Sequence, residues 1–269
     1  MNLAGKAVLV IGGAGFIGSH TVEELLARDV KKVLVYDNFT RGKATNISKA
    51  LRDQRCEVYA AGGDIRDSEV LQEAMTGVDA VIHLAALWLL HCEEYPRAAF
   101  NVNIGGFFEV LEAARLTNIK RLIFASSASV YGDAQFTPMD ESHPYNNKNL
   151  YGATKIAGEH LARAYQHRYS LDFLGLRYMN VYGPRQDQHG AYTGVIPTVL
   201  NRIDDQQPLE VHGDGLQSYD FVYVEDVARA NVLALESEAT DEFVNVGTGV
   251  KTSVKDVVEL TLRLTQSEL

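Results

Sequence analysis

The sequence has only two cysteines and one tryptophan, and it has no long hydrophobic run. Cys56 and Cys92 are too few for a disulfide framework or a cysteine metal site, so we expect reduced thiols and no bound metal. No apolar run approaches the ~18 residues that a membrane-spanning helix needs. A strand pattern begins almost at the first residue, which argues against a signal peptide. Together these absences predict a cytoplasmic protein.

Positive charge is also scarce. The chain has 25 lysines and arginines against 35 aspartates and glutamates, which gives a net charge of -10. Nucleic acids and anionic membranes favour a basic face, so we expect neither as a partner. Of the 269 residues, 46% are hydrophobic and 22% are charged, an ordinary globular composition for one large domain or slightly more.

A glycine-rich turn follows the first strand pattern, at residues 7–11. Its glycines are Gly12, Gly15 and Gly18, and a helical pattern follows them. One glycine permits a tight turn, one lets the backbone approach a pyrophosphate, and one allows close packing of helix and strand. The helix N-terminus offers amide groups to the phosphates. Strand, glycines and helix in this order predict a dinucleotide site.

The second strand pattern, at residues 33–36, ends at Asp37, 19 residues past Gly18. A carboxylate there can accept hydrogen bonds from both ribose hydroxyls of NAD, and it disfavours a 2′-phosphate. We therefore expect NAD rather than NADP. The nearby cations Arg41 and Lys43 leave NADP as the alternative.

Two further strand patterns, at residues 56–60 and 80–84, complete the first half of the chain. After the earlier one, Asp64 either accepts from an adenine amino group, with Ile65 on the ring, or caps a helix. His83 is better explained as a packed histidine than as an acid–base group. Small residues after the later strand would let the backbone run along the cofactor. The residues in question are Leu84, Ala85 and Ala86.

Four strand–helix units in succession predict an α/β fold, a Rossmann-type doubly wound parallel sheet with right-handed crossovers. We expect the dinucleotide-binding domain to comprise residues 1–176. Shorter elements in residues 177–269 predict a smaller C-terminal substrate-binding part. Within it, elements at about 224–247 are candidates to return to the main domain.

A serine, a tyrosine and a lysine form the candidate catalytic group. Ser127 follows an apolar strand pattern at 122–125, so it should lie at the carboxyl end of the sheet, where ligands bind. Tyr151 and Lys155 lie one turn apart on a predicted helix. A lysine ammonium favours the phenolate of a tyrosine, whose unperturbed pKa is ~10. Alone, this pair is equally well explained as a solvated lysine beside a half-buried tyrosine.

The order of motifs resembles the extended short-chain dehydrogenases/reductases, specifically the NAD-dependent sugar-nucleotide epimerase/dehydratase family. The resemblance covers residues from about 7 to 250. The motifs that carry it are the glycine turn, Asp64-Ile65-Arg66-Asp67, His83-Leu84-Ala85-Ala86, the segment from Ser126 to Gly132, Tyr151-x-x-x-Lys155 and Arg177-Tyr178-x-Asn180-x-Tyr182-Gly183-Pro184.

The resemblance implies roles for particular residues. Ser127, Tyr151 and Lys155 would form the catalytic triad, with Tyr151 as the base. The implied NAD contacts are Gly12, Gly15, Phe16, Ile17, Gly18, Asp37, Asn38, Asp64, Ile65, Leu84, Ala85, Ala86, Tyr151 and Lys155. The implied substrate contacts are Ser127, Asn180, Arg185 and Tyr219, although ion pairing could also explain Arg177 and Arg185. The resemblance further implies a homodimer, a four-helix bundle of helices near residues 97–116 and 150–168.

Several residues depart from the family pattern. Ala128 and Ser129 stand where the family's dehydratases have an Asp-Glu pair for eliminating water, so we do not expect 4,6-dehydratase chemistry. Tyr219 replaces an arginine that would bind the diphosphate. Trp88 lies either in the core or in an apolar wall of the sugar pocket. The chain also stops at Leu269, several tens of residues sooner than most relatives.

We therefore expect an NAD-dependent epimerase of a nucleotide diphosphate sugar, a UDP-hexose or UDP-hexuronic acid inverted at C4. Tyr151 would take the C4 hydroxyl proton while hydride passes to NAD, and the resulting 4-keto sugar would be reduced on its other face. A sugar-nucleotide oxidoreductase or decarboxylase is the enzymatic alternative. A non-catalytic NAD-binding module is the alternative from a different class.

Overall fold

A seven-stranded parallel sheet organises the chain in the computed structural model, which describes residues 1–188, 193–211 and 213–267. The strand order is β10-β6-β5-β4-β1-β2-β3, and every neighbouring pair is parallel. The strands are β1 (Ala7–Ile11), β2 (Lys32–Tyr36), β3 (Cys56–Val58), β4 (Ala80–His83), β5 (Arg121–Ser127), β6 (Phe173–Tyr178) and β10 (Glu242–Val246). This order confirms the predicted Rossmann-type sheet.

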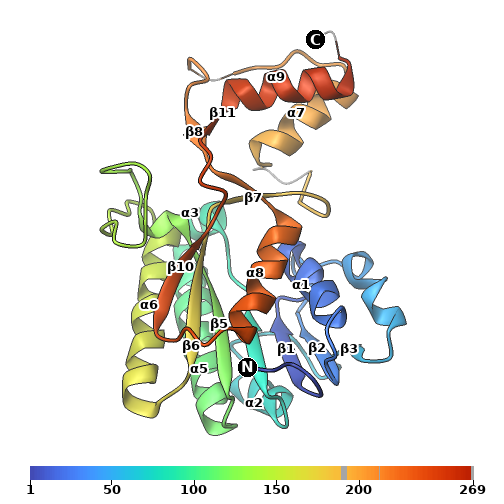
Figure 1. Cartoon of the computed structure of the whole chain (residues 1–269), viewed down its shortest axis with the longest axis vertical. Helices are drawn as coiled ribbons and strands as arrows, with labels where there is room; N and C mark the ends of the chain where they lie inside the picture. The colour runs from blue at the N-terminus through green and yellow to red at the C-terminus, as the bar shows by residue number, and fades with distance from the viewer. Residues whose placement is uncertain (189–192, 212, 268–269) are drawn as a thin grey trace.

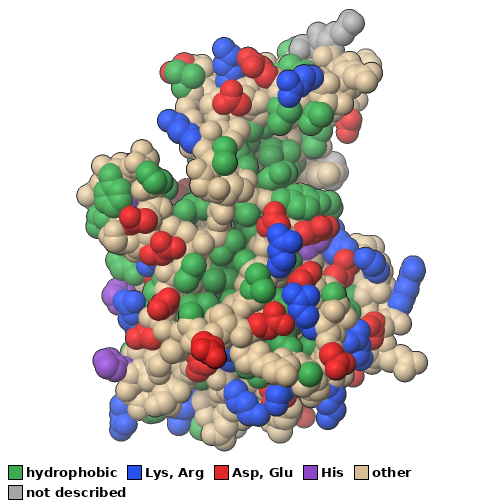
Figure 2. All heavy atoms as spheres, in the orientation of Figure 1, with side chains coloured by type: hydrophobic (Ala, Val, Ile, Leu, Met, Phe, Trp, Pro, Cys, Tyr) green, Lys and Arg blue, Asp and Glu red, His purple; other side chains and the backbone are tan. Residues whose placement is uncertain are grey.

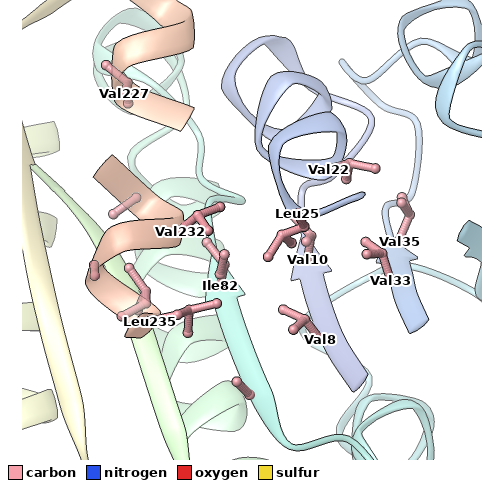
Figure 3. Packing of buried hydrophobic residues seen from close by; sticks show 14 of the residues in the cluster. Val8, Val10, Val22, Leu25, Val33, Val35, Ile82, Val227, Val232 and Leu235 are labelled. Carbon is pink, nitrogen blue, oxygen red and sulfur yellow. The ribbon is translucent and has the colours of Figure 1, made fainter. Parts of the chain in front are cut away.

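Helices cover both faces of the sheet. One face carries α1 (Phe16–Leu26) and α8 (Val224–Glu236), which pack side by side (Figure 1). Figure 3 shows Leu25 of α1 near Val10 of β1, and Val232 of α8 near Ile82 of β4. The other face carries α2 (Ser68–Met75), α5 (Phe107–Leu116) and α6 (Leu150–Tyr169).

A smaller lobe stands over the carboxyl edge of the sheet (Figure 1). In it β7 pairs with β9 and β8 pairs with β11. Its elements are β7 (Asn180–Tyr182), α7 (Val195–Asp204), β8 (Ser218–Tyr219), β9 (Phe221–Tyr223), β11 (Thr252–Ser253) and α9 (Val254–Thr265). Figure 2 shows hydrophobic side chains gathered at the waist between this lobe and the sheet.

Short helical segments connect the main elements. They are η1 (Ala44–Ile47), η2 (Ala50–Arg52), α3 (Leu89–Glu94), α4 (Pro96–Ala99), the π-helix η3 (Phe100–Gly106) and η4 (Ala128–Val130). No helix among the described residues is long and apolar enough to cross a membrane.

Two sequence-based expectations need correction. The third strand ends at Val58 rather than at residue 60. The aspartate that caps α2 is Asp67, whose side chain accepts from the amide of Val70, so Asp64 is not the cap. Residues 242–246 form β10, which pairs with β6 of the main sheet. The division at residue 176 stays a prediction, and β6 extends across it.

Helix α8 should contribute strongly to the stability of the sheet domain. Leu235 of α8 is fully buried, whereas Leu233 on the same helix is 51% exposed. We expect Leu235→Ala to lower the free energy of unfolding by about 2–5 kcal/mol, because it leaves a cavity against the sheet. Leu233→Ala, the matched control, should change it by about 0.5 kcal/mol or less. Chemical denaturation measures both, and equal effects would contradict the packing of α8.

Candidate active site

The site begins where the strand order reverses, between β1 and β4, the usual ligand-binding point of such sheets. Gly12 follows β1 with a φ of +82°, a conformation that favours glycine. A Cβ on Gly12 would lie 2.8 Å from the amide nitrogen of Ala85, after β4. A Cβ on Gly18 would lie 2.1 Å from the carbonyl oxygen of Gly12. The loops after β1 and β4 therefore approach each other through their backbones, with no room for a side chain at Gly12.

The turn after β1 fits a dinucleotide. Gly15 is the N-cap of α1 and offers no side chain to the first amides, and the first turn has no acidic residue, so those amides can donate hydrogen bonds to phosphate oxygens. Asp37 lies at the end of β2 and accepts from the amides of Ala14 and Phe39 at 2.9 and 2.8 Å. Burial raises the pKa of Asp37. Its carboxylate is thus fixed beside the glycine turn, and Asn38 is next to it in the loop.

The residues predicted for the adenine end have different surroundings. Asp64 forms an ion pair with Arg66, which holds its pKa below the usual value. Ile65 is 3% exposed and packs in the core, where a Cβ on Gly106 would lie 2.6 Å from it. The carbonyl of Asp64 accepts from the hydroxyl of Tyr36 at 2.8 Å. The predicted contact of Asp64 with adenine stays a prediction.

Ser127, Tyr151 and Lys155 meet at the carboxyl end of β5. Asn149 caps α6 by accepting from the amide of Gly152 at 2.8 Å, which sets the first turn that carries Tyr151. Ser127 lies close enough to Tyr151 to lower the pKa of its phenol, and the Oγ of Ser127 accepts from the amide of Ser129 at 3.1 Å. The Lys155 ammonium donates to the carbonyl of Ala125 at 2.7 Å and lies 5.5 Å from the ring centre of Tyr151. The predicted group is therefore assembled around one helical turn.

Burial outweighs any effect of Lys155 on the pKa of Tyr151 in the cofactor-free protein. Burial is the main cause that raises the pKa of Tyr151, to about 12, and Ser127 and the charge of Arg41 oppose it only in part. Burial also lowers the pKa of Lys155 to about 8. Desolvation disfavours both charged forms, so the pair by itself is not a ready phenolate–ammonium pair.

A buried ion pair lies one turn further along α6. Glu159 and Arg177 are 1% and 4% exposed and pair in two contacts of 2.9 and 2.8 Å. Glu159 also accepts from Ser126 of β5 and from Tyr145, and Arg177 donates to Tyr131 at 2.9 Å. This network joins α6, β5 and β6 directly behind the catalytic turn. Ion pairing thus accounts for Arg177.

Known proteins share this architecture. A model described as the NAD dependent epimerase/dehydratase family matches residues 8–247. A putative UDP-glucose 4-epimerase of Methanocaldococcus jannaschii is 38% identical over 94% of this chain and 80% of its own. The chain belongs to the NAD-dependent epimerase/dehydratase family.

Two solved structures of similar proteins differ in their activity. A UDP-N-acetylglucosamine 4-epimerase from Methanobrevibacter ruminantium, in complex with UDP-N-acetylmuramic acid, has a TM-score of 0.93 and 34% identity, over 98% of this chain and 84% of its own. A dTDP-glucose 4,6-dehydratase from Streptomyces venezuelae, with NAD bound, has a TM-score of 0.89 and 30% identity, over 97% and 81%. This is thus an NAD-dependent, sugar-nucleotide family whose members run different reactions.

Three residues near the triad of this epimerase/dehydratase family member are structural. His83 is 2% exposed and stacks 5.1 Å from Phe107, and burial lowers its pKa to about 3, so it is the neutral, packed histidine expected. Cys92 is buried with a raised pKa and its thiol donates to the carbonyl of Leu87, which disfavours a thiolate.

Asn103, which the sequence did not single out, forms hydrogen bonds with Leu87 and Thr154 and so connects the loop after β4 to α6. Its position inside η3 gives no signal in the sequence.

The residues predicted for the substrate lie on both sides of the waist. Asn180 is exposed at the start of β7. Arg185 pairs with Glu23 of α1, while its Nη1 is buried without a partner among the described residues. Tyr219 of β8 is 44% exposed, 5.9 Å from the ring of Phe221. Trp88 is half-buried and so is not a core residue, and the Arg41 guanidinium lies over its ring, 4.9 Å from the centre. A wall of the sugar pocket stays a prediction.

Metal ligands are not gathered anywhere in the part of the chain that the structure describes: no group of three or more histidine, cysteine, aspartate or glutamate side chains could hold an ion. Both cysteines are free and buried.

The shifted pKa of Lys155 gives a test of the site without substrate. The folded protein has a pKa of about 8 at this lysine and the unfolded chain 10.5, so between these values the unfolded chain binds more protons. The free energy of unfolding of the cofactor-free protein should therefore rise with pH between about 8 and 10.5. Lys155→Met should remove that rise, and Lys31→Met on the surface is the charge-matched control. Denaturation across this range measures it, and parallel profiles for all three proteins would contradict the burial of the ammonium.

Proposed function

We propose that the protein is an NAD-dependent epimerase of a nucleotide diphosphate sugar, inverting C4 of a UDP-hexose or UDP-hexuronic acid. The observation that carries the proposal is the grouping of Ser127, Tyr151 and the Lys155 ammonium at the carboxyl end of β5, with Ala128 and Ser129 following Ser127. Elimination of water needs an acid for the leaving hydroxyl and a base for the adjacent carbon. The two residues after Ser127 provide neither, so proton and hydride transfer at one carbon remain.

The chain's own residues divide the work as follows. Gly12, Gly18 and the N-terminus of α1 hold the cofactor phosphates, and Asp37 holds the adenosine ribose. The chemistry that NAD supplies when bound is reversible hydride transfer, which epimerisation needs twice, once on each face of a 4-keto sugar. Ser127 hydrogen-bonds the reacting oxygen, and Tyr151 takes and returns its proton.

The high pKa of Tyr151 in the free protein has a consequence for this mechanism. Burial makes the phenol a weak acid, so a second positive charge beside it is needed to favour the phenolate. The oxidised nicotinamide ring of NAD carries such a charge. Bound NAD would supply that charge, and Tyr151 would then hold its proton less tightly.

The sugar nucleotide is held differently from the family pattern in this proposal. Tyr219 offers a ring and a hydroxyl in place of a guanidinium, so a bidentate charged contact with the diphosphate is lost. Arg185 has a buried donor, Nη1, that remains available for a phosphate oxygen. We therefore assign the substrate diphosphate to Arg185 and to Asn180, which is exposed at the start of β7.

A single incubation discriminates the reactions. The purified protein is mixed with UDP-glucose, UDP-N-acetylglucosamine or UDP-glucuronic acid, and the products are followed by NMR and NADH absorbance. We expect the C4 epimer without net NADH. Tyr151→Phe should lower kcat about 10²- to 10⁴-fold and leave sugar binding intact, whereas Tyr169→Phe at the other end of α6 should have no effect.

Other outcomes assign the alternatives. Stoichiometric NADH or carbon dioxide would identify an oxidoreductase or a decarboxylase. Binding of NAD without sugar binding in calorimetry would identify a non-catalytic module. Activity that survives Tyr151→Phe would refute the role of that tyrosine.

We also propose that the active form is a homodimer through α5 and α6. Phe100 and Phe108 are 58% and 42% exposed on the face that joins η3 to α5. A cavity of about 460 Å³ lies between them, with Leu161 of α6 on its other wall. Apolar rings flanking a groove of this size favour a second copy of the same face.

Charge on this face should separate the copies. The double variant Phe100→Glu/Phe108→Glu should be monomeric in analytical ultracentrifugation because it places two carboxylates in the apolar interface. Leu233→Glu, an exposed leucine of α8, should leave the dimer intact. A wild-type monomer at micromolar concentration would overturn the dimer.

A further inference from the structure

Arg41 makes a contact that the catalytic mechanism does not use. It belongs to the loop after β2, and its guanidinium stacks on Trp88 of the loop after β4, 4.9 Å from the ring centre. In the sheet β1 lies between β2 and β4. Neighbouring strands are ~4.8 Å apart, so the contact has to bridge ~10 Å across the end of β1. The glycine turn that starts there lies beneath it.

The loop that carries Arg41 is anchored on that turn. The amide of Lys43 and the side chain of Asn46 both donate to the carbonyl of Ala14, at 3.0 and 2.9 Å. A Cβ on Gly42 would lie 2.9 Å from the Cβ of Ala14. The loop is therefore folded over the first residues of the dinucleotide site, and Arg41 extends from it.

Electrostatics give a second indication of where the guanidinium lies. The charge of Arg41 lowers the pKa of Tyr151, the catalytic tyrosine, and burial lowers the pKa of Arg41 against the charges of Asp187 and Tyr151. Although Arg41 as a whole is exposed, its guanidinium is therefore close enough to Tyr151 for the two groups to affect each other's pKa.

We propose that Arg41, seated on Trp88, closes the outer side of the dinucleotide groove and retains NAD by binding its pyrophosphate. The inner side of the groove offers only neutral amides at the N-terminus of α1. Stacking on Trp88 occupies the face of the guanidinium and leaves its N–H edge for phosphate oxygens. An epimerase that regenerates its cofactor in every cycle gains from slow release.

Cofactor dissociation tests this directly. Each protein is loaded with NADH and chased with excess NAD while NADH fluorescence is followed. Because Arg41 supplies a charged hydrogen bond, Arg41→Ala should release NADH about tenfold faster or more. Arg41→Lys, which keeps the charge but not the planar fork, should fall between. Arg52→Ala, an exposed arginine of η2, is the control and should match the wild type.

Trp88 supplies two further readouts. It is the only tryptophan of the chain, so energy transfer from it to NADH reports binding beside it. Trp88→Ala should speed NADH release as well. In the Arg41→Ala background it should speed release little further, because Trp88 acts on the cofactor only by positioning the guanidinium of Arg41. Wild-type release by Arg41→Ala, or independent effects of the two variants, would overturn the proposal. The readout is binding, so it is separate from the identity of the sugar and from turnover.

Discussion

The buried ammonium of Lys155 is the constraint on which the site depends. A charge removed from water needs partners, and this one donates to the carbonyl of Ala125 and lies between the rings of Phe124 and Tyr151. These partners are available only if α6 presses directly on β5. The ion pair of Glu159 with Arg177 then fixes the next turn of the helix against β6. The contacts that hold Lys155 in place are therefore the same contacts that pack α6 against β5.

The cofactor half and the sugar half of the ligand-binding edge differ in whether backbone or side chains line them. The cofactor half uses backbone: Gly12 approaches Ala85 so closely that side chains are excluded. Main-chain geometry of this kind suits a single dinucleotide. In the proposed function the sugar half uses side chains such as Tyr219 and Arg185, which lie outside the seven strands of the sheet. That division explains how relatives of one fold run epimerisation, dehydration and decarboxylation.

Sequence reasoning worked where a short local pattern determines the structure. The apolar run before Ser127 and the i, i+4 spacing of Tyr151 and Lys155 were sufficient to predict β5 and α6.

Sequence reasoning failed where two local explanations were equally good. Asp64 and Asp67 both precede a helix, and the choice of Asp67 as the cap depends on the turn geometry between them. The stacking of Arg41 on Trp88 was also out of reach, because 47 residues separate the two side chains.

The sequence by itself determined the family, the Rossmann-type sheet and the glycine turn after β1, because glycine spacing and helical periodicity are local properties of the chain. Only the tertiary structure decided how deeply the predicted triad is buried. The spacing of Tyr151 and Lys155 predicted a phenol made acidic by its neighbour, but desolvation acts on both groups and raises the pKa of the tyrosine to about 12. The burial of these two side chains depends on segments that are far apart in the sequence, so no short stretch of sequence predicts it.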